Sequence, residues 1–202
     1  MAARTGNAEL PTAALTLSTE KLRALQPELF VPRSWTKFLR ENGYRLGALN
    51  EDVEYWKRQF ADHLRAGVAE AAVVASASPL LIATFAGELD CVAMLRFDGK
   101  FAQRNPLSAG ARLLSVNSYL EWNFWLPEDL TLGPRASGKY RNFAPLIADF
   151  LADDPETVER LKTEIPERIW KRTDMLGREY LAANGEKARD GRPLLCHLPA
   201  KK

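Results

Sequence analysis

Short runs of hydrophobic residues dominate the middle of the chain, between about residues 71 and 119. The runs AVVASAS, PLLIATF, CVAMLRF and ARLLSVNSY are rich in Val, Ile, Leu and Phe, and the breaks AGELD, DGK and QRNPLSAG separate them. PLLIATF turns through residues 86–89 into DCVAMLRF, which predicts a β-hairpin over about residues 79–97. Both strands of this hairpin are apolar on both faces, so we expect it to lie in the centre of a sheet.

Helical patterns come before this β-rich region. The clearest spans residues 51–66, where Asn50 can cap the N-terminus and apolar residues recur at steps of three and four up to Gly67. Upstream, Ser18 and Ser34 are suitable N-caps for two shorter helices. The N-terminal part of the chain is therefore expected to hold three helices, with breaks at Pro27 and Pro32 and after Gly43.

Helical patterns return in the last third of the chain. Helices are predicted to begin at Asn142, at Asp154 followed by Pro155, and after Pro166. The apolar run PLLCHL near the C-terminus predicts one more short strand. Helices followed by strands and then by helices favour an α+β fold, because a doubly wound parallel sheet would need strict alternation.

These elements predict a simple organisation. Residues 1–16 are small and polar without an apolar period, which is typical of a flexible N-terminal tail. Residues 17–202 predict a single α+β domain. In that domain a small antiparallel sheet of three to five strands, with its central hairpin at about residues 79–97, is packed by N-terminal and C-terminal helices.

Composition and charge narrow the functional classes. The chain has 202 residues, of which 46% are hydrophobic and 27% charged, as in globular rather than disordered proteins. The 28 basic and 26 acidic residues leave a net charge of +2, so nucleic acid is an unlikely partner. A signal-peptide core and a run of about 18 apolar residues are both missing from the sequence, which predicts a soluble, cytoplasmic protein with no membrane association.

The segment GPRASGKY, which begins at Gly133, comes close to the phosphate-loop pattern. Gly133, Gly138 and Lys139 are in the required places, but Tyr140 stands where Ser or Thr must hold magnesium. A phosphate loop also follows a buried strand and opens a helix, whereas only LTL precedes Gly133 and the helical signal starts after Tyr140. The pattern therefore favours an exposed loop over a nucleotide site.

Aromatic and basic residues are concentrated around this loop, between residues 119 and 143. The residues that we expect to contact a partner are Tyr119, Trp122, Trp125, Arg135, Lys139, Tyr140 and Arg141. Aromatic side chains beside cations can form hot spots for a protein or stacking platforms for single-stranded nucleic acid, and the small number of cations favours a protein. Large aromatic residues also build cores, so the burial of Trp122 and Trp125 decides between the two interpretations.

Catalytic and metal-binding patterns are weak. His63, His197, Cys91 and Cys196 lack the short paired spacings of a zinc site. Cys196 and His197 are adjacent, but neighbouring residues of a strand point to opposite faces and make a poor nucleophile and base. We therefore assign no catalytic residue, no metal site and no cofactor, and we expect both thiols to be free in a reducing compartment.

Acidic residues in predicted turns leave one chemical possibility open. Glu88 with Asp90, or Glu121 with Glu128 and Asp129, could form an acid–base pair if the fold brought two carboxyl groups within about 5 to 9 Å. Acidic turn residues are more often solvated, so this stays a reserve hypothesis.

The sequence thus favours a non-enzymatic binding or regulatory module that presents the segment 119–143 to an unidentified protein partner. The alternative is a phosphate- or nucleotide-ligand binder, or a small enzyme, that uses Arg135, Lys139 and Arg141 as anion contacts.

Overall fold

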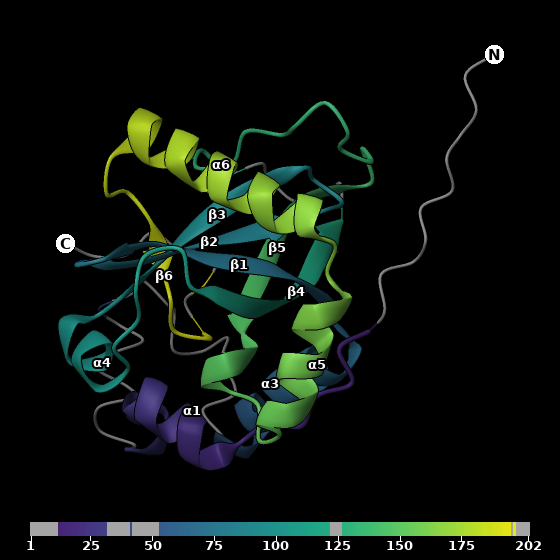
Figure 1. Cartoon of the computed structure of the whole chain (residues 1–202). Coiled ribbons are helices and arrows are strands. Elements are labelled where there is room, and N and C mark those ends of the chain that lie inside the picture. Colours follow the sequence, from purple (N-terminus) through teal and green to yellow (C-terminus); the bar gives the residue numbers. More distant parts are fainter. Residues whose placement is uncertain (1–11, 32–40, 42–52, 122–126, 195, 197–202) are drawn as a thin grey trace.

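The fold of the chain, determined as a computed structural model, is built on one mixed β-sheet of six strands (Figure 1). The structure describes residues 12–31, 41, 53–121, 127–194 and 196. The strands are β1 (Val68–Ala77), β2 (Leu80–Ala86), β3 (Cys91–Phe97), β4 (Arg112–Glu121), β5 (Tyr140–Ile147) and β6 (Arg189–Asp190). Their order across the sheet is β5, β4, β1, β2, β3, β6. Neighbouring strands are antiparallel except β3 and β6, which run parallel.

The predicted α+β class and the predicted central hairpin are both confirmed. β2 pairs with β3 from Leu80 opposite Phe97 to Ala86 opposite Cys91, and each of the two strands has another neighbour. The prediction of three to five antiparallel strands was imprecise, because the sheet has six strands and one parallel pair at its edge.

Two segments at the edges of the sheet differ from the predictions. The helix predicted from Asn142 is wrong, because these residues belong to β5. Pro145 has no N–H to donate, but β5 is an edge strand, where a proline can be accommodated. At the other edge β6 is Arg189–Asp190 rather than the run PLLCHL, whose described residues lie in turns. The buried Arg189 side chain anchors β6 through its ion pair with Asp129.

The helices among the described residues are α1 (Thr19–Leu25), η1 (Pro27–Phe30), α3 (Val53–Ala66), α4 (Gly99–Arg104), η2 (Ala148–Phe150), α5 (Pro155–Glu164) and α6 (Glu167–Asn184). The predicted helices at residues 51–66, after Asp154 and after Pro166 correspond to α3, α5 and α6. Ser18 and Asp154 both accept hydrogen bonds from backbone N–H groups of the first helical turn, as predicted for N-caps. Of the helix predicted from Ser34, the structure describes only Glu41, which is helical.

Residues 12–16, which fall in the predicted N-terminal tail, lie against the end of α3 and the start of β1. The Ala13 N–H donates to the Gly67 carbonyl at 2.9 Å, and the Leu15 N–H donates to the Leu64 carbonyl at 3.2 Å. The side chains of Ala13 and Leu15 are buried. Residues 1–11 lie outside the described residues.

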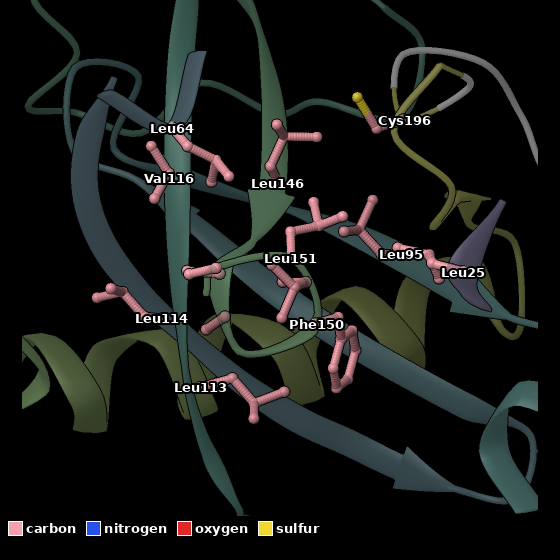
Figure 2. Packing of buried hydrophobic residues seen from close by; sticks show 14 of the residues in the cluster. Leu25, Leu64, Leu95, Leu113, Leu114, Val116, Leu146, Phe150, Leu151 and Cys196 are labelled. Carbon is pink, nitrogen blue, oxygen red and sulfur yellow. The ribbon is translucent and has the colours of Figure 1, made fainter. Parts of the chain in front are cut away.

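Figure 1 shows α6 on one side of the sheet and α1 on the other. α6 lies across β1, β2 and β3 and buries Trp170 and Tyr180 against them. A Cβ at Gly177 of α6 would lie 2.8 Å from the Cβ of Ala83, so only glycine allows this close approach. The larger core gathers side chains of α1, α3, β4 and the segment around Leu151 (Figure 2). The start of β1 and the end of β2 lie beside the junction of α5 and α6.

Candidate functional site

A cavity of about 220 Å³ lies where the start of β1 and the end of β2 meet the junction of α5 and α6. We call it the turn cavity. It is lined by Ala69, Glu70, Ala71, Phe85, Gly87, Glu88, Asp90, Arg135, Ser137, Leu161, Glu164, Ile165, Pro166 and Ile169. The apolar members come from β1, β2, α5 and α6, whereas most charged members come from β1 and from the turn between β2 and β3. The turn cavity therefore joins an apolar wall to a group of charged side chains.

The loop of residues 127–139 docks on the turn between β2 and β3. The Gly133 N–H donates to the Leu89 carbonyl at 3.1 Å, and the Ser137 N–H donates to the Glu88 carbonyl at 2.8 Å. A Cβ at Gly133 would lie 2.2 Å from the backbone oxygen of Asp90, so the loop can approach the turn this closely only with glycine there. This docking brings Arg135 to the turn cavity.

Asp90 is a buried carboxylate that two arginines hold. Its backbone has a φ of 50°, in the left-handed region that Asp and Asn tolerate better than most residues. Its Oδ1 lies 2.9 Å from Arg135 Nη2 and 2.8 Å from Arg172 Nη2. Burial acts to raise the pKa of Asp90, but hydrogen bonds from Arg135 and Arg172 and the charge of Arg172 outweigh it and lower the pKa below its ordinary value. Asp90 is therefore ionised at neutral pH.

Glu70 is a second buried carboxyl group, and it has a different set of partners. Its Oε1 accepts the Gly87 N–H at 2.6 Å, and its Oε2 accepts hydrogen bonds from the Tyr119 hydroxyl at 2.6 Å and from Asn117 Nδ2. All three donors are neutral. Burial raises the pKa of Glu70 to about 7, the three hydrogen bonds limit the rise, and the charge of Glu88 adds to it. Glu70 therefore changes its charge near neutral pH.

β4 supplies two of the donors from one face of the strand. Ser115, Asn117 and Tyr119 alternate along β4, and Ser115 stands opposite Glu70 in the register. Asn117 Nδ2 also donates to the Phe85 carbonyl at 2.7 Å, and Asn117 Oδ1 accepts the Ser115 hydroxyl at 2.6 Å. A hydrogen-bonded polar row thus crosses a largely apolar sheet and fixes the position of the Glu70 carboxyl group.

A buried carboxyl group with a pKa near 7 beside a cavity can transfer a proton or bind a cation. Burial and the charge of Glu70 raise the pKa of Tyr119 well above 10, so Tyr119 stays protonated and acts as a hydrogen-bond donor. Among the described residues no group of three or more His, Cys, Asp and Glu side chains could hold a metal ion.

Two of the residues predicted to contact a partner lie at or near the turn cavity. Arg135 lines it, and the Tyr119 hydroxyl binds Glu70, which lines it. The Tyr119 ring is half-buried, with its centroid 5.1 Å from that of Tyr140. The aromatic and basic segment thus reaches the turn cavity at these two residues.

The other predicted contact residues are separate from the turn cavity or are not described. Lys139 Nζ lies 4.9 Å from the centre of the Tyr140 ring. Arg141 is half-buried in β5, and none of these three residues lines the cavity. Trp122 and Trp125 lie outside the described residues, so the decision between core and surface for them stays open.

The segment GPRASGKY lacks the surroundings of a phosphate loop. Strand β5 follows it where a phosphate loop would open a helix. Gly133 packs against Asp90, and Arg135 pairs with the Asp90 carboxylate. The segment instead holds the loop of residues 127–139 against the turn between β2 and β3.

Two of the acidic residues that we considered as members of a catalytic acid–base pair form ion pairs with arginines. Asp90 is bound by arginines, and Asp129 Oδ2 lies 2.7 Å from Arg189 Nε. Glu88 lines the turn cavity together with Asp90.

Sequence reasoning missed Glu70, Asn117 and Arg172. The predicted strand AVVASAS begins after Glu70, whereas β1 begins at Val68 and includes it. A charged residue between the alanines of this strand was the available signal, because a carboxyl group inside a buried strand needs partners. Arg172 gives no local signal, because it approaches Asp90 from a helix 82 positions away.

The other thiol and imidazole groups that the structure describes do not line the turn cavity. Cys91 and Cys196 are free thiols, and burial raises the pKa of each to about 12, so neither is a thiolate at neutral pH. His63 Nε2 lies 3.0 Å from the Val116 carbonyl, to which it donates, and burial lowers the pKa of His63 to about 4. His197 lies outside the described residues.

In the part of the chain that the structure describes, none of the helices has the length and apolar character needed to cross a membrane. Compared with known proteins, this chain matches no family model, no curated protein and no solved structure.

Proposed function

We propose that this protein binds a small, partly apolar molecule in the turn cavity. The observation that carries the proposal is that Glu70, a buried carboxyl group that titrates near neutral pH, belongs to the wall of a cavity with many apolar lining residues. Ligand sites typically combine apolar walls with a few convergent polar groups and with residues of perturbed pKa.

The size of the turn cavity limits the ligand. Its volume is about 220 Å³. An apolar cavity of about 150 Å³ is large enough to hold benzene. A molecule with one ring, or an alkyl group of similar size, and a short polar group therefore fits. Phe85, Ile165 and Ile169 offer apolar contacts, while Glu70 and Ser137 offer polar ones.

The other functional hypotheses have less structural support. Use of Arg135, Lys139 and Arg141 as anion contacts is disfavoured, because Arg135 already pairs with Asp90 and the other two do not line the turn cavity. A protein-binding role of the segment 119–143 stays a prediction. Its described rings Tyr119 and Tyr140 pack against the buried cluster that contains Phe143.

Ligand-observed NMR with a library of one-ring fragments tests the proposal. We expect saturable binding to the wild-type protein and its loss in Ile169→Trp, because a larger side chain at this position fills the cavity. Met175→Trp is the matched control, since Met175 is exposed on the same helix and does not line the cavity.

Two results would overturn the proposal. One is that no fragment binds the wild-type protein saturably. The other is that fragments bind Ile169→Trp as well as they bind Met175→Trp. Circular dichroism of both variants shows whether the fold is retained, and binding is compared at equal folded concentration.

A further inference from the structure

We infer that the turn cavity selects a small organic cation, a protonated amine on an apolar body, and that its ammonium group binds Glu70. This inference rests on the proposed function, because it names the chemical class of the ligand for the same cavity. The hydrogen-bond pattern of Glu70 and the balance of charges around the cavity both point to this class.

The Glu70 carboxyl group can accept one more hydrogen bond. A carboxylate offers about four lone-pair positions. Oε2 accepts hydrogen bonds from Asn117 and Tyr119, whereas Oε1 accepts one, from the Gly87 N–H. Among the described contacts Oε1 thus keeps an acceptor position, and both Glu70 and Gly87 line the turn cavity. A ligand N–H can fill that position.

The charged groups around the turn cavity are mainly acidic. Those that face it or touch its lining are Glu70 from β1, Glu88 and Asp90 from the turn, Glu164 from α5, Arg135 from the loop and Arg172 from α6. Asp90 pairs with both arginines, and Glu164 pairs with Arg160 of its own helix. Glu70 is left with neutral donors only, so an ionised Glu70 gains a cationic partner from an ammonium ligand.

Charge disfavours neutral and anionic ligands by the same reasoning. A carboxylate or phosphate ligand would lie beside the acidic residues Glu70 and Glu88. Among the residues that line the cavity, the basic residue is Arg135, and it is already paired with Asp90. A neutral alcohol could donate to Oε1, but it would leave the buried carboxylate without a counter-charge. We therefore expect the order of affinity amine, then alcohol, then acid.

The affinity for an amine should depend on pH, because it depends on the charge of Glu70. With the pKa of Glu70 raised to about 7, a falling pH removes the carboxylate that binds the amine. The apparent affinity for an amine should then fall about tenfold for each pH unit below 7, in proportion to the ionised fraction. An alcohol should show no such loss.

The experiment compares three probes of nearly equal size, phenethylamine, 2-phenylethanol and phenylacetate. Their dissociation constants are measured by NMR titration at pH 8 and pH 6 for the wild type, Glu70→Gln and Glu179→Gln. Glu179→Gln is the control, because it makes the same chemical change at an exposed position of α6. We expect phenethylamine to bind the wild type and the control at least tenfold more tightly than Glu70→Gln at pH 8.

Proton release gives a second readout that does not depend on a folded Glu70→Gln variant. At pH 6.5 a group with a pKa of about 7 is roughly three-quarters protonated, and amine binding should release that proton. Calorimetry in two buffers of different ionisation enthalpy counts the released protons for the wild-type protein.

The outcomes separate this inference from the proposed function. If 2-phenylethanol or phenylacetate binds as tightly as phenethylamine, and Ile169→Trp abolishes that binding, the cavity is a ligand site but the amine assignment is wrong. The assignment also fails if amine binding releases no proton or is unchanged in Glu70→Gln. If no probe and no fragment binds, the proposed function itself fails.

Discussion

Glu70 and Asp90 form a natural comparison, because both carboxyl groups are almost fully buried and both belong to the wall of the turn cavity. Asp90 lies against two arginines and has a lowered pKa. Glu70 has three neutral donors, and its pKa is raised to about 7. Burial outweighs the hydrogen bonds at Glu70, whereas the hydrogen bonds from both arginines and the charge of Arg172 outweigh burial at Asp90.

The different partners suit the two carboxyl groups to different roles: Asp90 holds segments of the fold together, and Glu70 can gain or lose a proton. The Asp90 carboxylate is committed to holding the loop and α6 to the turn between β2 and β3. Glu70 is held in position by hydrogen bonds, yet its proton is exchangeable near neutral pH. Pairs of acids whose surroundings push their pKa values apart commonly divide such roles at functional sites.

The largest effect is expected from removing the charge of Asp90. Asp90→Asn keeps a residue that tolerates the positive φ but leaves Arg135 and Arg172 without their carboxylate. We expect unfolding free energy to fall by about 3 kcal/mol, near the lower end of losses for broken buried ion pairs, because Arg135 is largely exposed. Urea unfolding at pH 7 measures the change. A loss below about 1 kcal/mol would show that the arginines do not depend on Asp90.

A smaller effect with a distinct pH dependence is expected from Glu70→Gln. The pKa of Glu70 is raised from 4.5 to about 7 in the folded state, so its contribution to stability is fully present below pH 4.5 and is lost as the pH rises through 7. Between pH 5 and pH 8 the wild type should therefore lose about 2 kcal/mol that Glu70→Gln does not lose.

The measurement for Glu70 is the difference in unfolding free energy between the two proteins at each pH. His63 acts in the opposite direction, because its pKa is lowered to about 4 and its contribution is lost as the pH falls from 6.5 through 4. His63 is present in both proteins, so its contribution cancels in the difference. Parallel pH profiles for the wild type and Glu70→Gln would contradict a raised pKa of Glu70.

Local signals in the sequence predicted the elements but only part of the site. The caps Ser18 and Asp154 and the apolar runs of the hairpin act within a few residues, so helices and central strands could be read from the chain. Asn142 as a possible N-cap favoured a helix, and Pro145 is compatible with a first helical turn; that this proline also fits strand β5 depends on an edge position that only the complete sheet defines.

The candidate site depends on contacts between distant segments. Asp90 and Glu88 were identified as turn acids, but burial beside Arg172 required the packing of α6. Asn117 and Glu70 meet because β4 pairs with β1 across 47 positions. The charge states near neutral pH depend on that burial and on those partners, so the sequence identified the acidic residues of the turn but neither Glu70 nor the arginine partner Arg172.

The smallest expected effect compares the two arginines of Asp90. Arg172→Ala removes a partner whose side chain is 23% exposed, whereas Arg135→Ala removes one that is 61% exposed. The backbone N–H of residue 135 also donates to Asp90 Oδ2 and survives the second substitution. We expect losses of about 1.5 kcal/mol for Arg172→Ala and about 0.5 kcal/mol for Arg135→Ala by urea unfolding.

The double variant tests whether partner charge alone distinguishes the two acids. Without both arginine side chains, the Asp90 carboxylate keeps the backbone N–H of residue 135 as a donor and, like Glu70, has no cationic partner among its described contacts. The pKa of Asp90 should then rise from its lowered value, because the side-chain hydrogen bonds of both arginines and the charge of Arg172 are removed while burial still acts to raise it. NMR titration of the Asp90 carboxyl carbon follows this shift. If its pKa stays low in the double variant, hydrogen bonds from the backbone, and not the arginines, keep Asp90 ionised.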